Sequence, residues 1–81
     1  MKHLEQLIGE HIDESLGTAE ARLKKYGVSV WAIVGHLEGV SGDMQQVAAD
    51  YDVPEEAIQA AERYYRKHKR LIDARRAMNA V

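Results

Sequence analysis

The sequence of 81 residues contains no cysteine and a single proline. The absence of cysteine excludes a disulfide framework, a thiolate metal site and a cysteine nucleophile. No apolar run approaches the roughly 20 residues that a membrane span needs, and the N-terminal region has no signal-peptide core. We therefore expect a cytoplasmic protein without a membrane anchor.

The residue patterns that carry catalysis are also missing. There is no Gly-rich phosphate loop, no serine with a base nearby in sequence and no His-Glu-x-x-His motif. Glu10, His11, Asp13 and Glu14 stand close together, but neighbours in a helix project from different faces, so we interpret them as a solvated acidic surface. We predict that the chain is not an enzyme and holds neither a metal nor a cofactor.

The composition is that of an ordinary globular protein, with 46% hydrophobic and 30% charged residues. We expect one domain over residues 1–81. A chain this short has a core that is only marginally sufficient, which favours self-association.

Charge is distributed unevenly along the chain. Residues 1–61 carry 4 Lys or Arg against 11 Asp or Glu, and residues 62–81 carry 7 against 2, so the body is −7 and the tail +5. Such a charge run is either a solvated helix face or a binding surface. The basic set consists of Arg63, Arg66, Lys67, Lys69, Arg70, Arg75 and Arg76.

Residues 1–28 are expected to form an N-terminal arm. Apolar residues recur there at helical spacing, interrupted at Gly9 and closed at Gly17, which favours a helix through Leu4, Leu7, Ile8, Ile12 and Leu16. The alternation of Val28 and Val30 after Gly27 instead indicates an extended segment or hairpin arm within residues 21–30.

Residues 29–68 are expected to form a three-helix core. Ser29 is predicted to cap a helix that starts at Val30 and stops at Gly39. A second helix covers residues 44–51, and a third begins with Pro54 in its first turn. The pattern leaves open whether the third helix ends near His68 or continues into a basic C-terminal helix or tail over residues 69–81. The predicted fold class is mainly α, with a short extended or β N-terminal portion.

Residues 44–67 match the spacing of a helix-turn-helix corner. Such a corner needs a small residue where the helices touch, a tight turn and apolar residues on each side of the turn. Ala48, Asp52, Val53 and Ile58 stand at these positions. Asp52 replaces the usual glycine, and aspartate tolerates the left-handed conformation better than most residues.

The exposed face of the third helix is poorly suited to DNA. The positions that would enter a major groove are Pro54, Glu55, Glu56, Gln59, Ala60 and Arg63. The two carboxylates oppose the phosphate neutralisation that gives most of the affinity for a duplex. The candidate nucleic-acid contacts are Gln59, Arg63, Arg66 and Lys67.

Four segments resemble family 433 of the domains of unknown function. They are Gly-Thr-Ala-Glu-Ala-Arg at 17–22, Gly-Val-Ser-Val-Trp-Ala-Ile-Val at 27–34, Val-Ala-Ala-Asp-Tyr at 47–51 and Ala-Ala-Glu-Arg-Tyr-Tyr-Arg-Lys-His at 60–68. The resemblance covers residues 17–73. It implies a small prokaryotic helical domain and an antitoxin-like role of the VapB kind, without an established catalytic residue.

The resemblance also implies a partner. Toxins associated with such antitoxins are compact ribonucleases with a metal-bound acidic site, which the antitoxin blocks with a basic helical tail. The candidate partner contacts here are Arg70, Arg75 and Arg76, with the last two reaching into the acidic pocket.

Adjacent aromatic residues suggest a second kind of contact. We expect Trp31 and one of Tyr64 and Tyr65 in the core, and the other tyrosine at a homodimer interface. The leading hypothesis is an antitoxin-like regulatory protein that binds a partner protein, with DNA as a second candidate ligand. The alternatives are a dimeric interaction or scaffold module without DNA binding, and an independent DNA-binding regulator.

Overall fold

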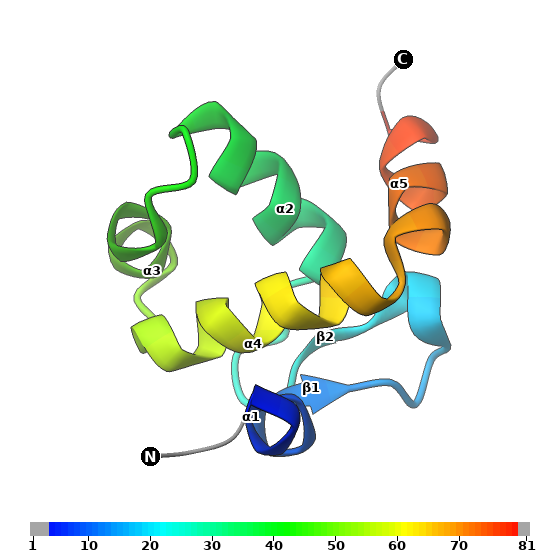
Figure 1. Cartoon of the computed structure of the whole chain (residues 1–81), viewed down its shortest axis with the longest axis horizontal. Helices are drawn as coiled ribbons and strands as arrows, with labels where there is room; N and C mark the ends of the chain where they lie inside the picture. The colour runs from blue at the N-terminus through cyan, green and yellow to red at the C-terminus, as the bar shows by residue number, and fades with distance from the viewer. Residues whose placement is uncertain (1–3, 80–81) are drawn as a thin grey trace.

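One helix, α4 (Glu55–Lys67), crosses the middle of the molecule, and the other elements surround it (Figure 1). The computed structural model describes residues 4–79. Along the chain, the elements before α4 are α1 (Leu4–His11), β1 (Ile12–Asp13), the 3-10 helix η1 (Thr18–Glu20), β2 (Arg22–Leu23), α2 (Val30–Gly39) and α3 (Met44–Tyr51). The chain continues after α4 with α5 (Lys69–Ala77). The mainly helical fold class is confirmed.

Small side chains allow α4 to take this central position. Ala57, Ala60 and Ala61 are fully buried, so α1, α2 and α3 can all approach the backbone of α4 closely. Ile58 and Tyr64 fill the remaining space of the core. The burial of Ala60 contradicts its predicted place on a DNA-facing surface.

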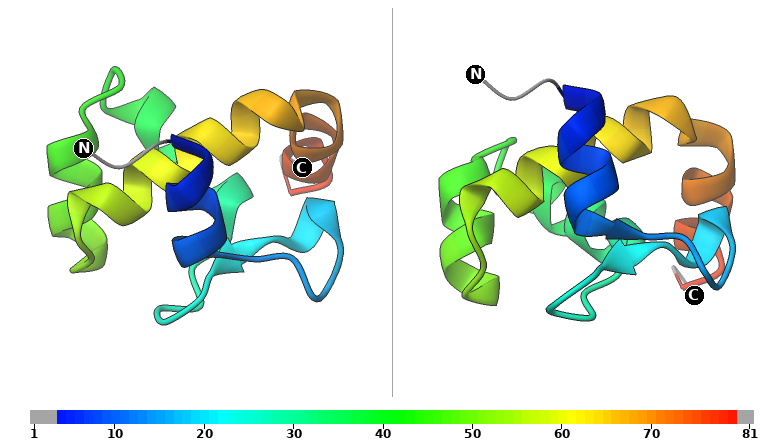
Figure 2. Two further views of the ribbon diagram at one scale, coloured as in Figure 1. Left: turned by 60° about the horizontal axis from the view of Figure 1, so that its bottom comes forward. Right: turned by 90° about the horizontal axis from the view of Figure 1, so that it is seen from below.

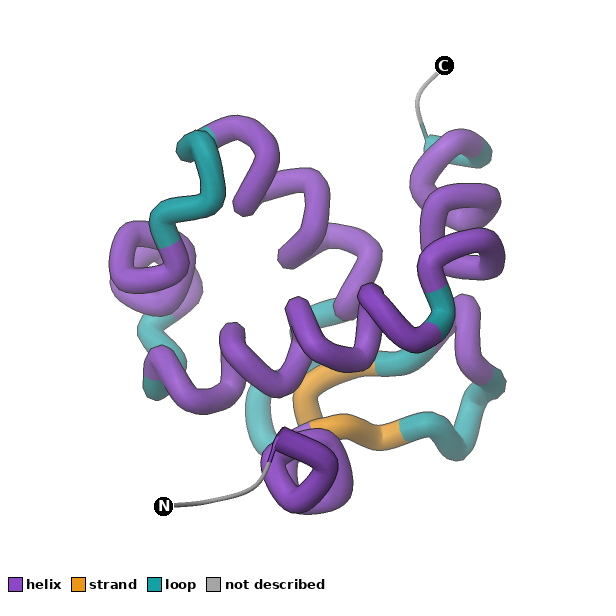
Figure 3. Tube along the Cα trace, in the orientation of Figure 1, coloured by secondary structure: helices purple, strands orange, loops and turns teal. Residues whose placement is uncertain are grey.

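The N-terminal helix is shorter than the spacing of its apolar residues predicted. Helix α1 ends at His11, and the chain continues into the antiparallel β1–β2 ladder (Figure 3). Ile12 pairs there with Leu23, and both side chains are buried. Leu16 is 59% exposed. A bridge from Arg22 to Ser29 extends the pairing and confirms the extended segment predicted within residues 21–30.

Helix α2 begins at Val30 and ends at Gly39, as predicted. Ser29 occupies the N-cap position, but its hydroxyl makes no capping bond, so that part of the prediction is wrong. The backbone of Ser29 is held instead by its bridge to Arg22. Trp31, expected in the core, is half-buried at the edge of it.

The corner between α3 and α4 has the predicted geometry. Asp43 caps α3 by accepting a hydrogen bond from the Gln46 amide at 3.1 Å. Asp52 adopts the left-handed conformation, with φ 56° and ψ 50°. Ala48, Val53 and Ile58 are all buried around the turn. Pro54 is the residue that precedes α4, one position before the expected one.

The chain turns sharply at His68, which answers the question that the sequence left open. With φ −131° and ψ 35°, His68 separates α4 from α5. Helix α5 folds back against α2 and η1 (Figure 2). The fully buried Ile72 anchors it there. Within residues 4–79, no helix is long and apolar enough to cross a membrane.

Candidate functional site

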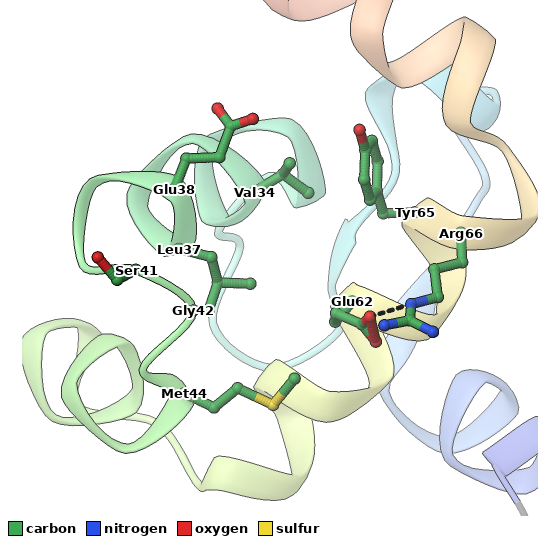
Figure 4. Close-up of a pocket in the computed structure, with 9 residues that line it drawn as sticks. All are labelled: Val34, Leu37, Glu38, Ser41, Gly42, Met44, Glu62, Tyr65 and Arg66. Atoms are coloured by element: carbon green, nitrogen blue, oxygen red, sulfur yellow. Dashed lines mark ion pairs between the residues drawn. The ribbon is translucent and has the colours of Figure 1, made fainter.

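A hollow of about 500 Å³ opens between α2, the start of α3 and α4 (Figure 4). Its apolar lining comes from Val34, Leu37, Met44 and Tyr65. These residues belong to three helices that the corner at Asp52 and the packing on α4 bring together. Its polar lining consists of Glu38, Ser41, Glu62 and Arg66, with Gly42 beside them.

A second hollow of about 400 Å³ continues toward α5 and shares Glu38 and Tyr65 with the first. We call the two together the α2–α4 groove. The hydroxyl of Tyr65 donates a hydrogen bond to Asp73 Oδ1 at 2.7 Å, which fixes the ring where the two hollows meet. The groove thus offers an apolar hollow beside a ring that is held by a hydrogen bond.

Ion pairs border this groove along its length. Arg66 pairs with Glu62, Arg76 pairs with Glu38, and Lys69 Nζ lies 2.7 Å from Asp73 Oδ2. Hydrogen bonds from Lys69 and from the Tyr65 hydroxyl lower the pKa of Asp73. Each of these carboxylates at the border is thus paired with a cation of the same chain.

Four cations project around His68, where α4 meets α5. Arg66, Lys67, Lys69 and Arg70 are all exposed, and we call this set the basic junction. The side chains of Arg66 and Lys69 are 69% and 67% exposed even though each has a carboxylate partner. The C-terminal end of α4 favours cations here, because its unpaired carbonyl groups carry partial negative charge.

The predicted partner contacts divide into two groups. Arg70 belongs to the basic junction, whereas Arg75 and Arg76 fold onto the body of the protein. Arg75 Nε donates to Glu20 Oε1 at 2.5 Å, and Arg76 pairs with Glu38. Their side chains are only 22% and 25% exposed. Neither residue extends from a free tail.

The predicted nucleic-acid contacts are also divided, because α1 crosses the face of α4 that would enter a DNA groove. His11 of α1 bonds to Glu56 at 2.9 Å, and Glu5 of α1 lies 3.7 Å from Arg63. Gln59 is half-buried on α4, while Lys67 pairs with Glu5 at 2.7 Å. Of the four contacts, Arg66 and Lys67 are exposed. Local sequence patterns do not reveal this cover, because α1 and α4 are about 50 residues apart.

The two tyrosines have different environments. Tyr64 is 1% exposed, and its hydroxyl donates to Glu14 Oε1 at 2.8 Å. Burial and the Glu14 carboxylate raise the pKa of Tyr64 to about 12. The expectation of one core tyrosine is confirmed, but Tyr64 is wrong as a candidate dimer contact. Tyr65 is half-buried in the groove and stays accessible.

The acidic residues near the N-terminus do not stay together. Glu14 bonds to Tyr64, whereas Asp13 accepts a bond from the Ser15 amide and lies near Arg22. That bond from the Ser15 amide lowers the pKa of Asp13. Glu10 and His11 lie apart from these two and face Glu56, a residue that sequence spacing did not connect with them.

Comparisons with family models, curated proteins and solved structures give no match for this chain. The fold and surface define the class: a small helical domain with a helix-turn-helix-like corner, an apolar groove and a basic junction. The resemblance to family 433 of the domains of unknown function stays a prediction.

Proposed function

We propose that the protein is a non-enzymatic, antitoxin-like regulatory domain that binds an acidic segment of a partner protein. The observation that carries this proposal is the position of the basic junction beside the α2–α4 groove. Arg66 belongs to both, and Tyr65 of the groove precedes it directly in α4. An apolar floor next to exposed cations is the surface that an acidic amphipathic segment fits.

The chemistry of the partner segment follows from these two features. An apolar side chain would occupy the hollow lined by Val34, Leu37 and Met44, and remove its surface from water. Carboxylates next to that side chain would face Arg66 and Arg70, since guanidinium groups bind carboxylates through two parallel hydrogen bonds. The charge pattern supports a partner with an acidic site.

The contact set differs from the one that the sequence suggested. Arg75 and Arg76 are mostly covered by the body of the protein, whereas Arg66 and Lys69 stay exposed although each has a carboxylate partner. We therefore assign partner binding to Arg66, Lys69 and Arg70. The antitoxin-like part rests on the resemblance of residues 17–73 and on the uneven charge.

The test compares two variants that change net charge equally at opposite ends of α4. Arg66→Gln with Arg70→Glu alters the basic junction and lowers the net charge by 3. Lys24→Gln with Lys25→Glu lowers it equally, at exposed sites near Pro54. Helix α4 has 13 residues and therefore separates the two sites by about 20 Å.

Affinity purification from the native cells, followed by mass spectrometry, gives the readout. We expect a protein that is recovered with wild type and with the Lys24/Lys25 variant but lost with the Arg66/Arg70 variant. Equal recovery with both variants, or no specific protein with wild type, would contradict the proposal. Melting temperatures of both variants establish that they fold.

A second experiment, which measures binding to duplex DNA, distinguishes this function from the DNA-binding alternative. Phosphate contacts make affinity fall steeply with salt concentration, so binding is measured by fluorescence anisotropy across a salt series. We expect no binding at about 150 mM salt, where surface charges are screened over about 8 Å. Salt-sensitive binding that the Arg66/Arg70 variant abolishes would instead support DNA as the ligand.

A further inference from the structure

Three side chains with metal-binding atoms meet at the end of α4 opposite the basic junction. Glu10 and His11 lie at the end of α1, and Glu56 lies in the first turn of α4. His11 Nε2 is 2.9 Å from Glu56 Oε2. One ligand atom from each of the three residues lies within 4.8 Å of the other two.

We propose that Glu10, His11 and Glu56 form a zinc-binding site. Zinc bonds to nitrogen and carboxylate oxygen of about 2.0–2.2 Å place tetrahedral ligand atoms about 3.4 Å apart. The separations here, from 2.9 Å to at most 4.8 Å, include this value. Small side-chain shifts would therefore bring the three atoms to coordination distance.

The surroundings of the trio leave room for a fourth ligand. A hollow of about 330 Å³ adjoins it, lined by the three residues together with Lys24, Lys25, Tyr26 and Pro54. Water entering from this hollow would complete a tetrahedral shell, as in open three-ligand zinc sites. The hollow lies where the end of α1 packs beside the start of α4.

Charge and ligand type select the ion. The two carboxylates carry two negative charges, which balance the two positive charges of a divalent ion. Two lysines also line the hollow, and one of them, Lys24, donates a hydrogen bond to the Gly9 carbonyl oxygen at 2.7 Å. An imidazole ligand favours zinc over magnesium and calcium, which prefer a larger number of oxygen ligands.

A metal ion at this position would join α1 to α4. The two helices pack against each other, and the site links the end of one to the start of the other. Ligands that bind only the folded state raise the melting temperature by mass action. Zinc would therefore stabilise the arrangement in which α1 covers α4.

The chain provides a matched control for this trio. His36 Nε2 is 2.7 Å from Asp50 Oδ2, a histidine–carboxylate pair of similar exposure. Among the described residues, this pair has no third metal-binding side chain within reach. Zinc affinity that depends on the trio should not change when His36 is replaced.

The experiment titrates the purified protein with zinc chloride in a calorimeter and repeats the melt with zinc and with magnesium. All proteins carry His3→Ala, so that this histidine supplies no ligand. We expect zinc to raise the melting temperature and magnesium to leave it unchanged. Glu10→Gln and His11→Asn should each weaken zinc binding by at least about tenfold. Loss of a residue that only supports a metal ligand already lowers metal affinity by about 10- to 100-fold.

His36→Asn should bind zinc as the parent does. Absence of zinc binding, or equal binding by the Glu10→Gln variant, would overturn the proposal. So would an equal loss of binding in His36→Asn. Glu10 is exposed, so Glu10→Gln decides the question even if the His11→Asn variant does not fold.

Discussion

The guanidinium carbon of Arg75 lies 4.6 Å from the centre of the Trp31 ring, and its Nε donates to Glu20 at 2.5 Å. One side chain of α5 thus contacts both α2 and η1. Trp31 is half-buried at the edge of the core, and the guanidinium group of Arg75 covers part of its ring. Arg75 therefore holds the basic C-terminal helix on the body of the protein.

Replacing Arg75 with alanine should destabilise the fold. Loss of the cation–π contact and of a partly exposed ion pair together costs roughly 1 kcal/mol. In a domain of this size, that cost lowers the melting temperature by about 4–8 °C. Thermal melting with Arg70→Ala as the exposed control tests this, and equal melting temperatures would show that Arg75 contributes nothing.

Ala48→Leu should disrupt the packing of the helix-turn-helix-like corner. Ala48 is 6% exposed, and a larger side chain there costs about 1–3 kcal/mol in strain. Ala49→Leu is the matched control, because Ala49 is the next residue and is exposed. The free energies of unfolding in urea should differ between the two variants. Similar values would mean that the contact at Ala48 accommodates leucine.

Tyr64→Phe should remove a bond between α4 and the segment after β1. The hydroxyl bonds to Glu14, and its loss costs about 1 kcal/mol. The pKa of Tyr64 is raised to about 12, so the unfolded chain loses this proton first as the pH rises. The contribution is complete below about pH 10 and is lost between about pH 10 and 12.

Urea unfolding measured over this alkaline range tests the direction of this pH dependence. The difference in stability between wild type and Tyr64→Phe should shrink as the pH rises. A difference that stays constant with pH would show that the Tyr64 hydroxyl does not titrate differently in the folded state.

Asp50→Asn should change the dependence of stability on acid. Hydrogen bonds from His36 and Gln46 lower the pKa of Asp50 below its ordinary value of 3.8. A lowered pKa contributes stability above 3.8, and that contribution is lost as the pH falls through the folded value. The advantage of wild type over Asp50→Asn in urea unfolding should therefore decrease from about pH 6 to pH 3. An advantage that is independent of pH would refute this assignment.

Helix α5 and the residue that follows it, Met78, carry an apolar stripe that predicts a homodimer. Leu71, Ala74 and Met78 are exposed and stand at positions i, i+3 and i+7, with Leu71 54% and Met78 71% exposed. Exposed apolar patches on small domains mark contact surfaces. Sedimentation velocity at micromolar concentration should show a dimer that Leu71→Lys dissociates and Leu16→Lys, at an exposed site outside the stripe, does not. A monomeric wild type would exclude this interface.

Local patterns were sufficient to predict the middle of the chain. The bounds of α2 and α3 and the left-handed turn at Asp52 follow from neighbouring residues, whose spacing and turn chemistry act over short distances. The end of α1 did not follow, because Ile12 fits a helical stripe and a core-facing strand equally well. Only its pairing with Leu23 decides between them.

The uneven charge of the chain correctly indicated electrostatic attraction, but it did not show which groups attract each other. The excess of acid before residue 62 and of base after it suggested attraction to an external partner. In the structure, much of this attraction is internal: Glu5 pairs with Lys67, Glu20 with Arg75 and Glu38 with Arg76. These pairs join residues far apart in the chain, so no local pattern reveals them. Glu56 was missed as a neighbour of His11 for the same reason.

The central position of α4 determines when the protein can fold during synthesis. Helix α1 is made first, but the surface that buries its Leu7 includes α4, which ends at Lys67. Ribosomes add about 5–20 residues each second, so α1 waits for several seconds without its packing surface. Residues 4–67 must therefore all have left the ribosome before α1 finds a stable place.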